Sequence, residues 1–216
     1  MKIGSLRVTQ EGLPYILVLV VISIMVGILS PYWSILPLLL AGYVMYFFRD
    51  PVRICPSDPF AIISAADGKV VGINEIREPN YLQKDSKRVS IFLSIFDVHI
   101  NRAPIEGNVQ YTQYQSGKFH NAMEGKSSIF NEHNLVGIEN HQSKVLVKQI
   151  AGMLARRIVC YCSLGDKIQA GQKIGLIKFG SRVEIYMPLD TEILVKLGDH
   201  VRGGETIIGR LQEKTQ

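Results

Sequence analysis

The sequence predicts a mainly β protein, an antiparallel hybrid of sandwich and barrel, preceded by an N-terminal α-helical membrane hairpin. Apolar residues crowd into the first fifty positions, and short β-type segments alternate with turns after Pro51. A glycine-rich motif also occurs twice near the C-terminus. The 216 residues provide room for one domain of ordinary size and an appendage. We therefore expect a membrane-anchoring hairpin over residues 1–53 and a β-rich domain over residues 54–216.

The anchor is predicted from two uncharged apolar runs, residues 13–29 and 32–48, which Ser30-Pro31 separates. Each run is about 25 Å long as a helix, at the short limit for crossing about 30 Å of hydrocarbon. Because proline restricts the backbone at the break, the two runs are expected to form antiparallel helices. The pair either crosses the bilayer twice or enters one leaflet, and Pro37 favours the shallower arrangement slightly.

Charges and aromatic rings at the ends of the runs indicate their orientation. Lys2 and Arg7 precede the pair, and Arg49 and Arg53 follow it, so both ends are expected on the cytoplasmic side of the cell membrane. A signal peptide fits poorly, because no small-residue cleavage site follows the first run. A buried hairpin of a soluble protein is the alternative, but little polar surface would remain to face water. Aromatic residues suited to the interface are Tyr15, Tyr32, Trp33, Tyr43 and Tyr46.

Charge and cysteine content narrow the classes of partner. The formal charge of +5 is a modest excess, and beside a membrane segment an anionic lipid surface suits it better than nucleic acid. The three cysteines provide no even disulfide framework. Cys160 and Cys162 are interpreted as small buried thiols in a reducing compartment. No metal site is expected, because no further ligands stand at suitable spacing.

After Pro51 the sequence has the pattern that is typical of an antiparallel β protein. Segments rich in Val, Ile and Tyr are separated by Gly, Asn and Asp turns, and no long helical period interrupts them. Closely spaced strands of this kind indicate a sandwich or barrel. The segment 117–133 is expected to be irregular or a short helical insertion. The predicted strands cover residues 69–76, 88–96, 107–115, 134–139, 143–151, 157–162, 173–178, 182–188 and 191–196.

An internal repeat supports the barrel. Residues 164–175 are echoed by residues 197–209, and both copies combine Leu-Gly-Asp, a short apolar strand and a second glycine turn. This unit recurs in biotinyl- and lipoyl-type barrels, where paired copies give quasi-two-fold symmetry. Residues 66–71 have the character of a third such edge. The repeat predicts a fold class and leaves the function open.

Two groups of residues are candidates for a catalytic or binding site. Gly180-Ser181 lies between two apolar strands and between the two copies of the repeat, although a Gly-Ser pair is by default a hairpin turn. The second group places His99 and Arg102 after an apolar strand and before Pro104, which suggests the rim of a site. A lone histidine is more often a structural residue. Neither pattern identifies a function by itself.

Taken together, these residues resemble the phosphatidylserine decarboxylase family in its short form. The resemblance covers nearly the whole chain, including the N-terminal hairpin, and it depends on the order and spacing of several motifs. These are Phe47-Phe48-Arg49-Asp50-Pro51, Ala65-Ala66-Asp67-Gly68-Lys69-Val70, Phe96-Asp97-Val98-His99 with Arg102 and Pro104, Gly117-Lys118-Phe119 with Asn121-Ala122, Asn131-Glu132 and Phe179-Gly180-Ser181-Arg182.

The resemblance implies a pyruvoyl enzyme made by self-cleavage. The Ser181 hydroxyl would attack the Gly180 carbonyl, and elimination would then separate chains 1–180 and 181–216, which remain together as a heterodimer. Hydrolysis would leave a covalent pyruvoyl group at position 181. This group would act as an electron sink in the decarboxylation of phosphatidylserine, a membrane lipid, to phosphatidylethanolamine.

The resemblance also implies roles for individual residues. The histidine and aspartate of a Ser-His-Asp triad correspond to His99 and Asp67. Longer bacterial forms carry a second histidine where this chain has Arg102, and we therefore keep His120 as the alternative base. His99 is expected to serve cleavage, decarboxylation or both. The candidates for binding the substrate, chiefly its phosphate, are Arg102, Lys118, His120 and Arg182.

Two other functions fit parts of the sequence. A non-catalytic, membrane-tethered lipoyl-like adaptor would explain the repeat, but Lys178 near the inter-repeat turn lacks the flanking methionine of a carrier hairpin. A pyruvoyl decarboxylase for a soluble amino acid would explain Gly180-Ser181, but it would have no use for the apolar hairpin. The sequence leaves the acyl-chain preference and the oligomeric state open.

Overall fold

The computed structural model describes residues 2–3, 6–118, 130–152, 157–178 and 180–212. The chain divides into two compact units, residues 1–52 and residues 53–216, which we call the helical unit and the β-rich unit. Each unit has its own set of packing contacts.

The helical unit consists of two helices that pack against each other, α1 (Leu13–Leu29) and α2 (Ile35–Phe47). Pro14 lies in the first turn of α1, where a missing N–H costs little. The Ser23 hydroxyl on α1 donates a hydrogen bond to the Ser34 carbonyl oxygen at 2.8 Å, which connects the two helices. Short elements precede α1, namely β1 (Lys2–Ile3), β2 (Leu6–Arg7) and the 3-10 helix Gln10–Gly12.

Both helices carry apolar side chains around most of their circumference. Leu17, Ile24 and Leu39 are each more than 60% exposed. Residues 10–29 form the one described helical segment that is long and apolar enough to cross a membrane, whereas α2 is shorter. So much apolar surface in contact with water would be unfavourable, and the helical unit therefore favours membrane association.

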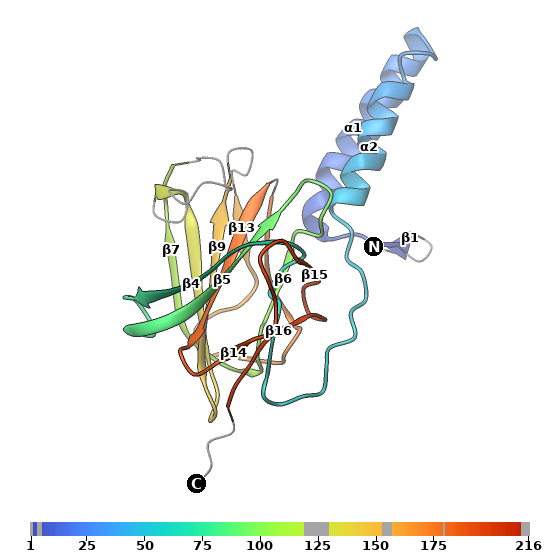
Figure 1. Ribbon diagram of the computed structural model, residues 1–216. Coiled ribbons are helices and arrows are strands. Elements are labelled where there is room, and N and C mark those ends of the chain that lie inside the picture. The colour runs from blue at the N-terminus through green and yellow to red at the C-terminus, as the bar shows by residue number, and fades with distance from the viewer. Residues whose placement is uncertain (1, 4–5, 119–129, 153–156, 179, 213–216) are drawn as a thin grey trace. The chain divides into compact units, whose positions relative to one another are not determined.

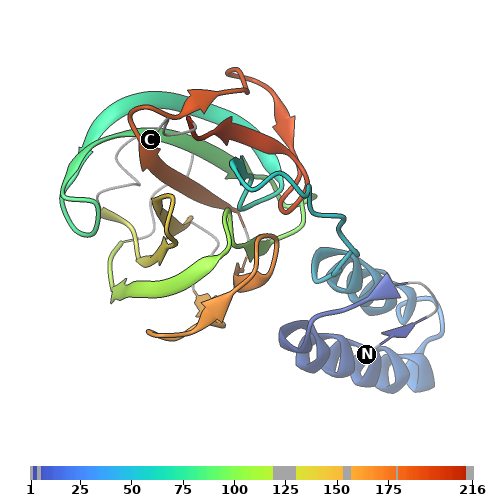
Figure 2. The ribbon, with the colours of Figure 1, turned by 90° about the horizontal axis from the view of Figure 1, so that it is seen from below.

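The β-rich unit is built on an eight-stranded sheet with the order β11-β7-β8-β9-β13-β5-β4-β15. All of its pairings are antiparallel, as the sequence predicted (Figure 1). The sheet curls into an open half-barrel (Figure 2). Its strands are β4 (Gly68–Glu78), β5 (Lys84–Leu93), β7 (Gly107–Gln115), β8 (His133–Glu139), β9 (Lys144–Ala151), β11 (Lys167–Ile168), β13 (Ser181–Pro188) and β15 (His200–Val201).

Two small sheets complete the β-rich unit. One has the order β10-β12-β6 and the other β14-β16-β3. Apolar side chains from both small sheets and from one face of the large sheet form a single buried cluster, which includes Ile62, Ile91, Ile174 and Val183. We call that face of the large sheet its inner face. The strands are β3 (Ala61–Ile63), β6 (Ile100–Arg102), β10 (Ile158–Cys160), β12 (Lys173–Ile177), β14 (Glu192–Ile193) and β16 (Ile207–Arg210).

The sequence repeat is also a structural repeat. In the first copy, the Asp166 carboxylate accepts the N–H of Ser163, and in the second the Asp199 carboxylate accepts the N–H of Lys196, both at 2.8 Å. The short strand of each copy, β11 or β15, then pairs with the start of a long strand, β7 or β4. The two copies therefore form the two edges of the large sheet and confirm the predicted symmetry.

The differences from the sequence predictions are local. The strand expected over residues 88–96 ends at Leu93, because the Asp97 carboxylate binds the N–H and hydroxyl of Ser94 and turns the chain. The short strands β3 and β6 lie outside the predicted segments, since three residues carry too little pattern. The insertion at 117–133 lies largely outside the described residues. Cys160 is exposed and Cys162 half-buried, so the interpretation of both as buried thiols is wrong.

Candidate active site

Ser181 begins β13 and lies in the middle of the large sheet. It pairs with Leu93 of β5 on one side and Ala151 of β9 on the other. All three residues are fully buried. Alternation along the strand places Ser181 on the same face as Val183, which is the inner, apolar face. Among the residues that the structure describes, none forms a hydrogen bond with the Ser181 hydroxyl.

Gly180 has the backbone conformation that the preceding turn requires. Its φ is +50°, in the left-handed region that favours glycine. A Cβ at this position would meet no described atom within 4 Å, so conformation rather than space restricts the residue. The peptide bond between Gly180 and Ser181 therefore joins a left-handed turn to a regular, buried strand.

His99 is fully buried and its ring is fixed by the main chain. Its Nδ1 lies 2.9 Å from the carbonyl oxygen of Asp97. A carbonyl only accepts hydrogen bonds, so Nδ1 carries the proton and, in the neutral ring, Nε2 carries the lone pair. This is the tautomer that a general base acting through Nε2 requires.

Hydrogen bonds with neighbouring strands fix the segment that carries His99. The N–H of Ile177 donates to the His99 carbonyl oxygen at 3.2 Å, four positions before Ser181 on the chain. Two residues after His99, the Asn101 side chain on β6 binds Gln149, which pairs with Val183 on β13. This hydrogen bond joins β6 to the large sheet two residues along the chain from His99 on one side and two residues from Ser181 on the other.

Asp67 is held by charges and by a repeat turn. Its carboxylate accepts hydrogen bonds from Arg53 at 2.5 Å and from the Gly203 N–H at 2.8 Å. Burial raises the pKa of Asp67, the carboxylate of Asp97 adds to the increase, and Arg53 and the Gly203 N–H oppose it. Asp67 therefore lies within electrostatic range of the turn that carries His99, while the contact at His99 Nδ1 comes from the Asp97 carbonyl.

Arg102 is buried among the repeat turns. Its guanidinium donates to the Gly171 carbonyl oxygen at 3.0 Å, and its Cδ would lie 2.7 Å from a Cβ placed at Gly204. Arg102 thus packs against one glycine turn from each repeat copy. Its position indicates a structural contribution in addition to any contact with an anion.

The other predicted binding residues lie in different surroundings. Lys118 is exposed and forms a β-bridge with Asn131. Arg182 is buried and belongs to the outer face of β13, where its guanidinium lies 3.8 Å from the Glu184 carboxylate. Burial lowers the pKa of Arg182, and Glu184 opposes that decrease. His120 lies outside the described residues.

A chain of buried amides next to the site was not predicted. Asn134 Nδ2 donates to Gln149 Oε1 at 2.9 Å, and Gln149 Nε2 donates to Asn101 Oδ1 at 2.7 Å. These three residues come from β8, β9 and β6, and all are at most 4% exposed. The bonds connect the large sheet to β6 directly beside His99. Polar residues inside otherwise apolar strands were the available signal, but their pairing depends on tertiary structure.

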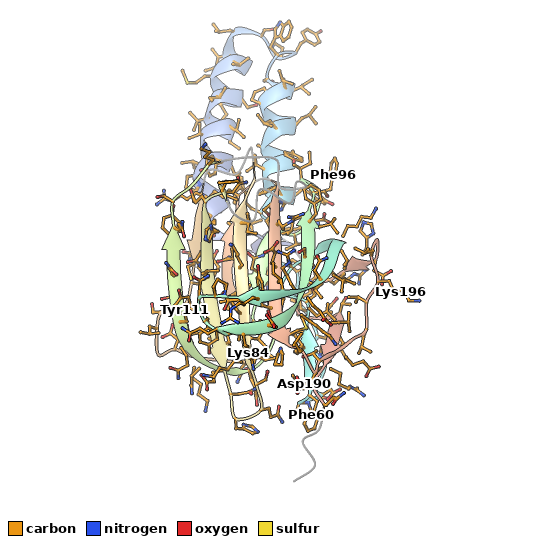
Figure 3. All side chains as sticks on the ribbon, turned by 60° about the vertical axis from the view of Figure 1, so that its left-hand side comes forward. Phe60, Lys84, Phe96, Tyr111, Asp190 and Lys196 are labelled. Atoms are coloured by element: carbon orange, nitrogen blue, oxygen red, sulfur yellow. The ribbon has the colours of Figure 1, made fainter. Side chains whose placement is uncertain are left out.

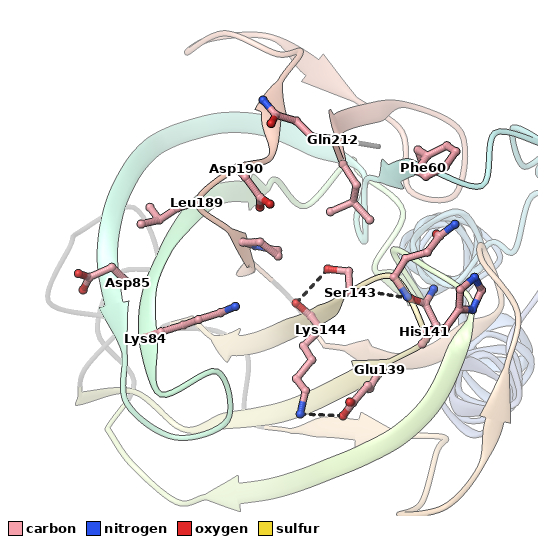
Figure 4. Close-up of a pocket in the computed structure, with 14 residues that line it drawn as sticks. Phe60, Lys84, Asp85, Glu139, His141, Ser143, Lys144, Leu189, Asp190 and Gln212 are labelled. Carbon is pink, nitrogen blue, oxygen red and sulfur yellow. Dashed lines mark hydrogen bonds and ion pairs between the residues drawn. The ribbon is translucent and has the colours of Figure 1, made fainter. Parts of the chain in front are cut away.

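A cavity of about 1120 Å³ lies at the opposite end of β13, and its walls include Lys84, Glu139 and Asp190 (Figure 4). Figure 3 shows Phe60, Lys84 and Asp190 at one end of the sheet and Phe96, in the turn before His99, at the other. β13 runs from Ser181 to Pro188, about 23 Å at the usual rise of a strand. The cavity therefore does not contain Ser181 or His99.

Comparisons with known proteins find relatives over nearly the whole chain. A sequence model described as phosphatidylserine decarboxylase matches residues 40–209. A protein of Carboxydothermus hydrogenoformans named phosphatidylserine decarboxylase proenzyme is 47% identical over 94% of this chain and 96% of its own length. Proteins of the same name from Symbiobacterium thermophilum and Geotalea uraniireducens are 42% and 40% identical, over 95% and 98% of this chain and 96% and 100% of their own lengths.

Proposed function

The chain belongs to the phosphatidylserine decarboxylase family, and we propose that it converts phosphatidylserine to phosphatidylethanolamine with a pyruvoyl group made from its own Ser181. The observation that carries this proposal is the buried hydroxyl of Ser181, which follows a left-handed glycine at the start of a central strand. A hydroxyl without a described hydrogen-bond partner in an apolar face is costly for folding. A reactive role for the Ser181 hydroxyl would explain why this costly group is present.

Self-cleavage begins when Ser181 Oγ attacks the carbonyl carbon of Gly180. The C–N bond then breaks, and an ester joins Gly180 to the serine oxygen. Loss of the Ser181 α-proton and of the Gly180 carboxylate leaves dehydroalanine, and its hydrolysis releases ammonia and leaves the pyruvoyl carbonyl. The left-handed conformation of Gly180 favours these steps, because a turn is easier to distort than a strand paired on both sides.

We assign the base to His99. Its Nε2 carries the lone pair once Nδ1 donates to the Asp97 carbonyl oxygen, and the hydrogen bond between Asn101 and Gln149 joins the segment after His99 to the large sheet that contains Ser181. Asp67 completes the proposed triad through electrostatics, as a buried carboxylate that favours the imidazolium formed during proton transfer. His120 remains the alternative base.

The residues around position 181 suit a small carbonyl group in place of serine. The position is enclosed by Leu93 and Ala151, so bulk water has little access to it. The pyruvoyl group supplies the electron sink for loss of CO₂. His99 is the proposed donor that returns a proton to the carbon that loses CO₂. Exposed Lys118 is the proposed contact for the lipid phosphate, while Arg102 and Arg182 stay predicted contacts that would first have to leave their present partners.

The two products of cleavage are expected to remain associated. The small chain, residues 181–216, contributes β13, which lies between β9 and β5 in the centre of the large sheet. Removing it would expose both neighbouring strands and the apolar core. The helical unit is proposed to hold the enzyme at the cytoplasmic face of the membrane that contains its substrate.

Two measurements on the purified full-length protein test the proposal. Intact mass spectrometry should find two chains, 1–180 and 181–216, and the smaller chain should resist Edman degradation because its N-terminus is a carbonyl group. Release of CO₂ should occur with phosphatidylserine in detergent micelles and not with free serine. A chain that stays intact under conditions where its fold is retained, or decarboxylation of free serine alone, would contradict the proposal.

A further inference from the structure

Two thiols of the β-rich unit lie side by side at its surface. Cys160 ends strand β10, and Cys162 lies two residues further along the chain. Their sulfur atoms are 3.6 Å apart, which is van der Waals contact. In a regular strand, side chains two residues apart lie on one face but are separated by about 6.6 Å along the chain. The sulfurs approach more closely here because the regular strand stops at Cys160.

Both thiols are held in this arrangement by the chain around them. The Cys160 thiol lies 3.3 Å from the carbonyl oxygen of Cys162, and the Cys162 thiol lies 3.8 Å from that of Ile174. The N–H of Tyr161, between the two cysteines, donates to Ile174 at 2.9 Å and fixes the backbone against β12. The two sulfurs therefore already face each other, and the main chain would not have to move far to bring them together.

The environment makes the two thiols chemically unequal. A hydrogen bond from the Cys162 thiol lowers the pKa of Cys160, and the Asn134 side chain contributes to this decrease. The same interaction raises the pKa of Cys162. Because the thiolate is the nucleophile, Cys160 is the more reactive sulfur, and it is also the exposed one.

Two other uses of a cysteine pair fit less well. A purely structural role would place both sulfurs in the core, but Cys160 is exposed and Cys162 only half-buried. A metal site would need at least a third ligand, and the described part of the chain contains no cluster of three His, Cys, Asp or Glu side chains.

We propose that Cys160 and Cys162 are a redox modification site, which a small-molecule disulfide such as glutathione disulfide converts reversibly into an intramolecular disulfide. The Cys160 thiolate attacks one sulfur of the oxidant, forming a mixed disulfide and releasing one thiolate. The sulfur of Cys162, after losing its proton, attacks the Cys160 sulfur and releases the second thiolate. The two protein thiols thus lose two electrons and two protons, and the oxidant is reduced to two thiols.

The short spacing predicts a labile bond. A disulfide needs its sulfurs about 2.05 Å apart with a dihedral angle near 90°, and a ring closed by one intervening residue meets these conditions only with strain. Strained and exposed disulfides are reduced more easily than structural ones. The pair would therefore respond to the redox state of the compartment, and it would not act as a permanent structural disulfide.

Peptide mass spectrometry of the full-length protein in detergent tests the proposal. The protein is incubated with glutathione disulfide, quenched in acid, alkylated with iodoacetamide and digested with trypsin, which releases both thiols in one peptide, residues 158–167. We expect this peptide to be lighter by two hydrogen atoms, to resist alkylation and to become alkylatable after treatment with dithiothreitol. A stable glutathione adduct at Cys160, or two thiols that remain alkylatable, would overturn the proposal.

Single substitutions then separate the roles of the two sulfurs. C162S should stop the reaction at the glutathione adduct on Cys160, and C160S should prevent the fast reaction at this site. Cys55 provides the matched control, because it is half-buried in another segment and lies in a separate tryptic peptide, residues 54–69. C55S should leave formation of the disulfide unchanged, and a loss of the product in C55S would mean that Cys55 is one of its partners.

Discussion

Strand β13 presents two faces of opposite chemistry. Its inner face carries Ser181, Val183 and Ile185 into an apolar cluster, while its outer face carries Arg182, Glu184 and Tyr186 into a layer of charges. On the outer face the Glu184 carboxylate accepts a hydrogen bond from Tyr186 at 2.7 Å and lies 3.7 Å from Arg88. On the inner face the Ser181 hydroxyl has no hydrogen-bond partner among the described residues.

This difference separates structural polar groups from reactive ones. A buried polar group is stable when its hydrogen bonds are made, and on the outer face the Glu184 carboxylate accepts hydrogen bonds from Tyr186 and Ser90. The inner face leaves a single hydroxyl in apolar surroundings, next to a glycine turn. The comparison predicts that changes on the inner face act on cleavage and that changes on the outer face act on stability.

S181A has the largest expected effect. Without the hydroxyl there is no nucleophile, so cleavage and decarboxylation should be lost completely while the fold is retained. Gel electrophoresis should show a single chain of 24.2 kDa. S90A is the control, because Ser90 is buried on the opposite face of the sheet and its hydroxyl lies 3.4 Å from Glu184. Cleavage between residues 180 and 181 in S181A would remove the basis of the assigned chemistry.

H99A should slow cleavage strongly without unfolding the chain. A positioned base contributes about 10²- to 10⁴-fold to a proton transfer, and the appearance of the small chain after cell-free synthesis measures the rate. H133Q is the control, since His133 is a second buried histidine whose Nδ1 also binds a main-chain carbonyl, that of Asn131. A normal rate in H99A would transfer the role of base to His120.

E184Q should lower stability and leave the Ser181 chemistry in place. Removing one partner of a buried ion pair costs about 3–5 kcal/mol, because the remaining guanidinium charges lose their counter-charge. The amide of glutamine keeps the shape of the side chain. Thermal unfolding should be measured in the S181A background, where the chain is single. E192Q, at an exposed position, is the control and should leave the melting temperature unchanged. If E184Q also melted at the same temperature as the S181A parent, the charge layer would be dispensable for stability.

G180A should have a moderate effect that comes from conformation alone. A non-glycine residue in the left-handed region costs about 1–2 kcal/mol, and no described atom would obstruct the new methyl group. The free energy of unfolding in the S181A background should fall by that amount. G42A provides the contrast, because Gly42 lies in α2 with open space around it and alanine favours helix. Unchanged stability in G180A would exclude strain at this turn.

The smallest expected effect concerns pH and His133. Burial lowers the pKa of His133 below 6.5, with Lys148 contributing and with Asn131 and Glu184 opposing the change. As the pH decreases, the imidazole of His133 therefore binds a proton in the unfolded chain before it does so in the folded chain. The free energy of unfolding should then fall as the pH decreases from about 6.5 towards the folded-state pKa, by at most about 1.4 kcal/mol per pH unit. H133Q should flatten this part of the melting curve against pH. H200Q, at an exposed position, should retain the dependence of the melting temperature on pH. If H133Q showed the same dependence as the unsubstituted chain, other titratable groups would be responsible for it.

Local patterns in the sequence predicted the architecture and several of its edges. Alternation along residues 182–188 and the regular turns predicted an antiparallel β protein, because each strand has one apolar face of period two. The repeat at Leu164 and Leu197 predicted the symmetry, since Asp and Gly at fixed positions encode the same local turn twice. The apolar runs of the helical unit were equally local signals.

Contacts between distant segments could not be predicted from local pattern. Three residues, such as those of β6, are too few to show a period, so the pairing of the segment around His99 with β12 emerged only from the folded chain. The amide chain from Asn134 to Asn101 and the exposure of Cys160 also depend on neighbours far along the chain. Local pattern thus fixes elements and turns, whereas burial and the contacts between distant strands are set by long-range packing.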